Sequence, residues 1–146
     1  MAKSVLCVDL GNVLIKFKEE HIKKLLKAGS FPGFLQCYLK FDQGTFNMAE
    51  MLKIANARYF KEFVSRADFV RALSEAVSEI NAPIFNEIRR FKELNRGELV
   101  MITDNNHYCF DYTAFKFPEA LELFRYGEKE NWILSWEERC LKREKT

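Results

Sequence analysis

Three short apolar runs, each ending in polar residues, predict three strands of one sheet. The runs extend from Ser4 to Asp9 (SVLCVD), from Leu99 to Thr103 (LVMIT) and, more briefly, from Trp132 to Leu134. A nearly continuous apolar run is typical of a strand that is covered on both faces of a parallel sheet. We therefore expect the polar residues after these runs to lie at the carboxyl ends of neighbouring strands.

Between the first two runs, residues 19–95 are mostly helix formers with apolar positions at helical spacing. Breaks occur at GSFPG, at FDQGT and near Asn81 to Pro83. This pattern predicts a helical insert over residues 19–79 and then a connecting helix near Pro83 to Leu94. Proline at the start of that helix and Gly97 just past its end match the usual asymmetry of helix termini.

A strand, a helical excursion, a strand, a helix and a further strand make an α/β pattern. We assign residues 1–18 and 80–146 to an α/β core with a parallel sheet, and residues 19–79 to the helical insert. Crossovers between parallel strands are right-handed almost without exception, and ligands of such sheets bind beyond the carboxyl ends of the strands. The polar strand ends should therefore converge on one place.

Composition indicates one soluble domain, since the 146 residues are 48% hydrophobic and 30% charged. No apolar run approaches the roughly 20 residues of a membrane span, and the start, MAKSVLCVDLGNV, lacks a signal-peptide pattern. We expect a cytoplasmic protein with no membrane partner. The 23 basic and 21 acidic residues are interspersed, with a net charge of +2, so we expect no nucleic-acid partner either.

The cysteines at positions 7, 37, 109 and 140 lack the paired spacing of a zinc or redox site, so we expect reduced thiols. Cys7 lies within an apolar run and is expected in the core. Neither His21 nor His107 has a spacing partner for a metal site, which favours ordinary surface or capping roles. His107 follows the second strand end closely, so contact with a substrate is its alternative role.

The fourteen phenylalanines, many at helical spacing, indicate core packing more than a stacking platform for nucleic acid. The alternative is an aromatic pocket in the insert, lined by Phe31, Phe34, Tyr38 and Phe41.

The first strand end carries a carboxylate and a glycine turn. Leu10, Gly11 and Asn12 follow Asp9, and backbone N–H groups in such a turn can point at an anion. A phosphate cradle is one interpretation. The other is an aspartate that caps the next turn, with a glycine that only permits it.

The second strand end offers a hydroxyl and backbone amides. Thr103, Asp104 and Asn105 could hold phosphoryl oxygens, as oxyanion donors do. A cluster of this kind is also typical of a helix cap, here for a segment that starts near His107.

Lys142 lies seven positions beyond Ser135, in SWEERCLK. It could return toward the strand ends and place an ammonium beside a carboxylate and a phosphate. The alternative for any single lysine is an ordinary surface position.

An aspartate after the first strand, a threonine after the second and a lysine after the third, in this order, resemble the haloacid dehalogenase (HAD) superfamily. DLGNV is similar to the first motif of one phosphatase-like branch, and ITDNN to its second motif. FDQGTFNMAEM resembles the cap-helix sequence of that branch, and ILSWEERCLKRE resembles the approach to the motif lysine.

The resemblance implies a Rossmann-like core, a small helical cap, and an Mg²⁺-dependent phosphatase for a small phosphorylated metabolite. It implies an aspartyl-phosphate intermediate on Asp9, with Mg²⁺ between this carboxylate and the phosphoryl oxygens. The Gly11 carbonyl would be a second metal ligand and Lys142 would balance the charge. The residues implied around the phosphate are Gly11, Asn12, Thr103, Asp104 and Asn105.

Two departures from the family pattern bear on activity. Position 11, where most phosphatases of the superfamily have an acid–base aspartate, is glycine. The family also continues beyond the motif lysine to further strands and acidic metal ligands, whereas this chain ends at Thr146. Three interpretations stay open. The chain is a fragment of a longer protein, or a second copy or partner covers the edge of its sheet, or it is a truncated, degenerate product. A degenerate product would bind without catalysis or have no function. Cofactor-free dehalogenation fits less well, because GN after the aspartate resembles the phosphatase-like branch.

Overall fold

The computed structural model describes residues 4–138, and its centre is a parallel sheet of three strands in the order β1-β4-β7. The strands are β1 (Ser4–Val8), β4 (Gly97–Thr103) and β7 (Trp132–Leu134). In the register, Val8 pairs with Met101 and Thr103 pairs with Leu134. The α/β class and the three-stranded parallel sheet expected from the sequence are confirmed.

The two longer strands differ in burial. In β4, Leu99 and Met101 are fully buried, as the middle strand of a sheet requires. In β1, Val5 is 57% and Leu6 is 37% exposed, and Cys7 is exposed as well. The expectation of a covered first strand and a core Cys7 is wrong, because β1 is the edge of the sheet among the described residues.

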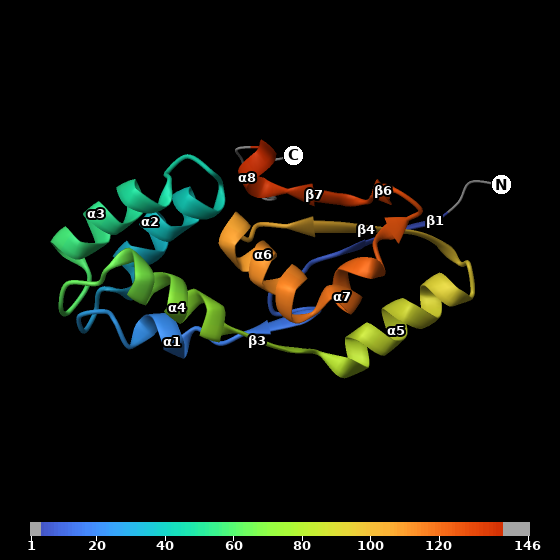
Figure 1. Ribbon diagram of the computed structural model, residues 1–146, viewed down its shortest axis with the longest axis horizontal. Helices are drawn as coiled ribbons and strands as arrows, with labels where there is room; N and C mark the ends of the chain where they lie inside the picture. Colours follow the sequence, from blue (N-terminus) through green and yellow to red (C-terminus); the bar gives the residue numbers. More distant parts are fainter. Residues whose placement is uncertain (1–3, 139–146) are drawn as a thin grey trace.

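The helices form two groups. Figure 1 shows α1 to α4 beyond the carboxyl ends of the sheet strands, and α5 to α7 alongside the sheet. The first group comprises α1 (Glu20–Lys23), α2 (Phe31–Asp42), α3 (Met48–Arg58) and α4 (Arg66–Ala76). The second comprises α5 (Ala82–Glu93), α6 (His107–Lys116) and α7 (Pro118–Glu122), and α8 (Ser135–Glu138) follows β7 directly.

Local sequence explains where several helices begin. Asn47 forms a capping box with Glu50 at the start of α3, and Ser65 caps α4 by accepting a hydrogen bond from the Asp68 N–H. The connecting helix expected near Pro83 is α5, with proline in its first turn.

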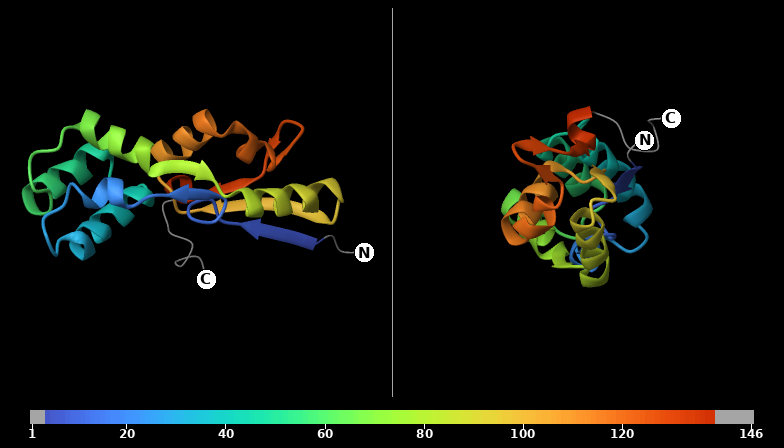
Figure 2. Two further views of the ribbon diagram at one scale, coloured as in Figure 1. Left: turned by 90° about the horizontal axis from the view of Figure 1, so that it is seen from below. Right: turned by 90° about the vertical axis from the view of Figure 1, so that its right-hand side faces the viewer.

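An antiparallel pair of strands, β2 (Ile15–Phe17) and β3 (Val77–Ile80), joins the two groups of helices and was not expected from the sequence. Figure 2 shows this pair between the helices α1 to α4 and the sheet. A small hairpin of β5 (Arg125–Tyr126) and β6 (Lys129–Glu130) was also not expected. The division into a core and a 19–79 cap stays a prediction.

The buried apolar side chains form one cluster that runs through both groups of helices. It contains Leu10 and Leu14 from the loop after β1, Phe34 and Phe69 from the helical insert, and Leu99 from the sheet. The insert therefore packs on the sheet through a shared core. Across residues 4–138, no helix is long and apolar enough to cross a membrane.

Candidate active site

The site begins where two neighbouring parallel strands end. Asp9 directly follows β1, and Thr103 is the last residue of β4. Because Val8 pairs with Met101, Asp9 and Thr103 both lie at the carboxyl ends of the sheet strands, as the sequence predicted. Asp9 is half-buried and Thr103 is 1% exposed.

The loop after β1 is a tight turn held by its own backbone. The Asp9 Oδ1 accepts a hydrogen bond from the Leu10 N–H at 2.8 Å. The Leu10 carbonyl accepts from the N–H of Ile15 at 2.9 Å, and the Asn12 N–H donates to the Ile15 carbonyl at 2.7 Å. Asn12 adopts the left-handed conformation with φ of 59°, which asparagine tolerates better than most residues.

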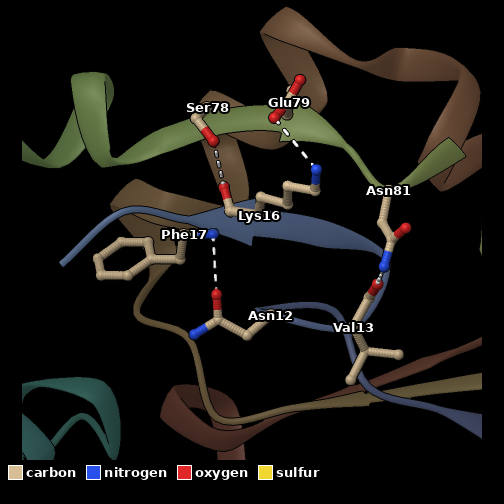
Figure 3. Close-up of polar contacts among 7 residues, drawn as sticks. All are labelled: Asn12, Val13, Lys16, Phe17, Ser78, Glu79 and Asn81. Atoms are coloured by element: carbon tan, nitrogen blue, oxygen red, sulfur yellow. Dashed lines mark hydrogen bonds and ion pairs between the residues drawn. The ribbon is translucent and has the colours of Figure 1, made fainter.

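Side chains tie this loop to the β2–β3 pair (Figure 3). The Asn12 Oδ1 accepts a hydrogen bond from the Phe17 N–H at 3.0 Å, and the Asn81 Nδ2 donates to the Val13 carbonyl at 3.0 Å. The same view shows the Ser78 hydroxyl donating to the Lys16 carbonyl and the ion pair of Lys16 with Glu79. The chain that carries Asp9 is thus connected directly to the strands that lead into and out of the helical insert.

The loop after β4 lies against the loop after β1. The Thr103 Oγ1 accepts a hydrogen bond from the Asn105 N–H at 3.2 Å. A Cβ atom at Gly11 would lie 3.0 Å from the Asn105 Oδ1, so this side chain packs directly on the glycine. Two of the residues proposed from the sequence at the strand ends, Gly11 and Asn105, are therefore in contact.

Asn106 caps α6 and is fully buried, which confirms the expectation of a helix cap before His107. Its Oδ1 accepts from the Cys109 N–H at 3.0 Å. Its Nδ2 donates to the Tyr38 hydroxyl and to the Asp42 Oδ1, both at 2.9 Å. One side chain thus links the loop after β4 to helix α2 of the insert.

Asp42 is the functional candidate that sequence reasoning missed. It is the last residue of α2 and only 8% exposed, and burial raises the pKa of its carboxyl well above the usual value, with Asp104 adding to the effect. Hydrogen bonds from Asn106 oppose this shift without cancelling it. The only signal in the sequence was the break at FDQGT, which appeared as a turn and gave no sign that its aspartate is buried.

The third strand end meets the same place. The Ser135 hydroxyl, directly after β7, donates to the Asp42 carbonyl at 2.7 Å and lies 3.5 Å from the Asn105 carbonyl. Next to it, Gly44 lies so close to the Trp136 backbone that a Cβ atom there would be 2.7 Å from the Trp136 carbonyl oxygen. The end of α2 and the turn after it therefore rest on the loop after β4 and on the first residues of α8.

Two cysteines of the described chain contribute packing here. Cys109 is buried beside Tyr38, and burial raises the pKa of its thiol to about 12. Cys37 is buried too, with a raised pKa. Both thiols stay protonated at neutral pH and are unsuited to nucleophilic attack.

The remaining residues that the sequence singled out lie in different surroundings. His107 is exposed and stacks on Tyr108. Phe34 and Phe41 are core residues at 2% exposure, and an apolar cavity of about 60 Å³ lies beside Phe31, Phe34 and Tyr38. Lys142 lies outside the described residues, so its position beside Asp9 stays a prediction.

The comparisons with known proteins give a fold. No protein-family model matches the sequence, and no match is found among curated proteins. Among solved structures, the chain resembles a wild-type HAD family enzyme from Bacteroides thetaiotaomicron in complex with magnesium and inorganic phosphate. The TM-score is 0.70 at 21% identity, over 98% of this chain and 74% of that chain. It also resembles a predicted HAD-like family hydrolase from Porphyromonas gingivalis, with a TM-score of 0.67 at 19% identity, over 96% and 70% of the two chains.

At these identities the likeness concerns the fold. The chain has the α/β fold of HAD family enzymes, and the resemblance noted from its motifs is confirmed at that level.

Proposed function

We propose that this chain is an Mg²⁺-dependent phosphatase of the HAD type, which acts on a small phosphorylated metabolite through an aspartyl-phosphate on Asp9. The observation that carries the proposal is the meeting of the two strand-end loops, where Gly11 packs on Asn105. A carboxylate and a hydroxyl at adjacent strand ends suit a nucleophile and a phosphate-binding group. The magnesium and phosphate of the Bacteroides enzyme add support.

The oxygen groups at this site are of the kind that bind Mg²⁺. Mg²⁺ prefers oxygen ligands and is commonly held by one or two carboxylates together with substrate phosphate and water. Asp9 supplies a carboxylate at the site, and within residues 4–138 the Gly11 carbonyl accepts no hydrogen bond that would compete with a metal. No group of three or more His, Cys, Asp or Glu side chains suited to a metal occurs within that range. When bound, the ion would reduce the repulsion between the Asp9 carboxylate and the phosphate.

The protein groups then have distinct tasks. Asp9 attacks phosphorus and forms the acyl phosphate. Thr103 already accepts a hydrogen bond from the Asn105 N–H, so its own hydroxyl hydrogen is available to a phosphoryl oxygen. The Asp104 backbone N–H and the Asn105 side chain would complete the phosphate site in this proposal. The Asn12 N–H and side chain are already engaged by Ile15 and Phe17. Lys142 would balance the negative charge.

The helices α1 to α4 act as a cap in this proposal. Their contacts with the loop after β4, through Tyr38 and Asp42, would hold the site closed and keep water away from the acyl phosphate until hydrolysis. We also propose a cytoplasmic setting, and a second copy of the chain or another protein on the exposed edge of β1, where Val5 and Leu6 leave apolar surface uncovered.

The alternative function is a non-catalytic HAD-like binding protein. Glycine at position 11 favours it, because general acid–base help is typically worth about 10² to 10⁴-fold in rate and glycine cannot provide it. Under this alternative the site would bind phosphate without turnover.

Hydrolysis of p-nitrophenyl phosphate by the purified chain, with and without Mg²⁺, tests the proposal. We expect turnover that requires Mg²⁺ and that falls to background in Asp9→Asn. Asp111→Asn is the matched control, because Asp111 is an exposed carboxylate on α6, and it should retain full activity. Absence of turnover in the wild type, with phosphate still bound, would favour the binding protein.

A further inference from the structure

The proposed phosphatase needs a proton donor that its first motif does not supply. When Asp9 displaces an alkoxide from phosphorus, the departing oxygen needs a proton. Gly11 has no side chain to give one, so a donor has to come from elsewhere in the molecule. The inference that follows rests on the proposed function and identifies this group.

The direction of the reaction places the donor on the cap. Displacement at phosphorus is roughly in line, so the leaving group points away from the nucleophile. Asp9 attacks from the end of the sheet, and Figure 1 shows α2 beyond that end. The leaving oxygen therefore faces the helical insert.

Asp42 is the carboxyl group that the insert brings to this place. Asn106 and Ser135, which follow two different sheet strands, both donate hydrogen bonds to it, to its side chain and its main chain respectively. Ser135 also approaches Asn105, whose side chain lies where a side chain at position 11 would project. The Asp42 carboxyl thus contacts, from the cap, the loop after β4 at Asn106, next to the Asn105 side chain that packs on Gly11.

We propose that Asp42 is the general acid of this site and donates its proton to the leaving oxygen. Its Oδ1 accepts a hydrogen bond from Asn106, so the proton resides on Oδ2. Burial raises the pKa of this carboxyl well above its ordinary value, and the nearby Asp104 raises it further. The group therefore carries a proton under conditions in which an exposed aspartate has lost it.

The step balances without any added reactant. The bond from the Asp9 oxygen to phosphorus forms as the bond from phosphorus to the leaving oxygen breaks. The proton on Asp42 moves to that oxygen, which departs as a neutral alcohol and leaves Asp42 as a carboxylate. Water then hydrolyses the acyl phosphate, and the proton it releases returns to Asp42.

Other titratable groups face Asp42 and are weaker candidates. Tyr38 on α2 and Cys109 on α6 have pKa values raised by burial, so each would form its anion only at high cost. Asp104, in the loop after β4, acts on Asp42 as a charge that favours its protonated form. His107 is not among the groups that act on Asp42, and its exposed ring packs on Tyr108.

The test compares two substrates that differ in their need for a proton. Ethyl phosphate releases an alkoxide and needs an acid, whereas 2,4-dinitrophenyl phosphate releases a stable phenolate and does not. The quantity to measure is kcat/KM, which reports phosphoryl transfer to Asp9. The variants are Asp42→Asn, which keeps the shape of the side chain, and Tyr38→Phe, which alters the same hydrogen-bond network but leaves the proposed acid in place.

We expect Asp42→Asn to lower kcat/KM for ethyl phosphate by about 10² to 10⁴-fold and for the dinitrophenyl ester by less than about tenfold. Tyr38→Phe should affect both substrates equally. Equal losses with both substrates in Asp42→Asn, or no loss with either, would overturn the inference. So would a wild type that cleaves only the dinitrophenyl ester. If the wild type shows no turnover that depends on Asp9 with either ester, the proposed function itself fails, and the two failures are thereby distinguished.

Discussion

The two loops that form the site are held in contrasting ways. The loop after β1, residues 9–13, is fixed by backbone turns and by Asn12 and Asn81 near the surface. The loop after β4, residues 103–106, is fixed by a buried network that draws on α2, α6 and the start of α8. The first loop is attached directly to the strands that lead into and out of the insert. The second is pre-organised, as the phosphate-binding role that we propose for it would require.

The buried network should make Asn106 the residue with the largest effect on stability. In Asn106→Ala, α6 loses its cap, while Tyr38 and Asp42 lose a hydrogen-bond donor in a buried place. We expect a loss of about 2–4 kcal/mol in the free energy of unfolding, measured by urea denaturation.

Asn47→Ala is the matched control, because Asn47 caps α3 with an equivalent bond at an exposed position. It should cost only about 1 kcal/mol. Equal losses in the two variants would mean that the links to α2 contribute nothing beyond an ordinary cap.

The same network should give the protein a characteristic dependence on pH. The ordinary pKa of an aspartate is about 3.9, and that of Asp42 is raised in the fold. Above about pH 4 the unfolded chain releases this proton while the folded chain keeps it. The contribution of Asp42 to the free energy of unfolding is therefore largest below pH 4. It falls by about 1.4 kcal/mol per pH unit until the pKa of the folded state is reached.

Asp42→Asn removes this titration. Denaturation of wild type and variant from pH 4 to pH 8 should give free energies of unfolding whose difference changes with that slope up to the folded pKa and then levels off, in the direction that favours the variant as pH rises. Parallel pH profiles would show that Asp42 is ionised in the folded protein.

Much of the first loop could be predicted from sequence, and little of the second. An apolar strand followed by Asp9 and Gly11 is a local pattern, and so is the cap at Asn106. The link from Asn106 to Asp42 spans 64 positions, and no periodicity or turn signal reports a contact of that range. Burial of Asp42 likewise depends on how the insert packs on the sheet.

The strands show the same limit. The apolar run of β1 predicted a strand correctly and its burial wrongly, because burial depends on neighbouring strands and not on the run itself. The three residues of β2 are too few to carry a periodic signal, and they are a strand only because β3 pairs with them.

Substitution of Asn12 probes the loop after β1. Asn12→Ala places an alanine in the left-handed region and removes the bond from the Phe17 N–H, so we expect a loss of about 1–2 kcal/mol. Asn12→Gly avoids the strain of an alanine in the left-handed conformation, so it should cost about half as much stability. Asn95 is the control, since its φ is 49° and it makes no side-chain hydrogen bond among the described residues. Asn95→Gly should leave the stability unchanged in thermal denaturation. If Asn95→Gly and Asn12→Gly lose the same stability, the hydrogen bond from the Phe17 N–H to Asn12 does not contribute.

The smallest effect is expected at the contact between the two loops. In Gly11→Ala the new methyl group meets the Asn105 Oδ1, the end of a side chain that can rotate away, so we expect a loss below about 1 kcal/mol. In Gly97→Ala the methyl group would instead run into the Ser4 carbonyl of the adjacent strand, which is backbone and cannot move without unpairing β1. That variant should lose about 1–3 kcal/mol. Comparable losses in the two would mean that the Asn105 side chain is held as firmly as the backbone of a strand.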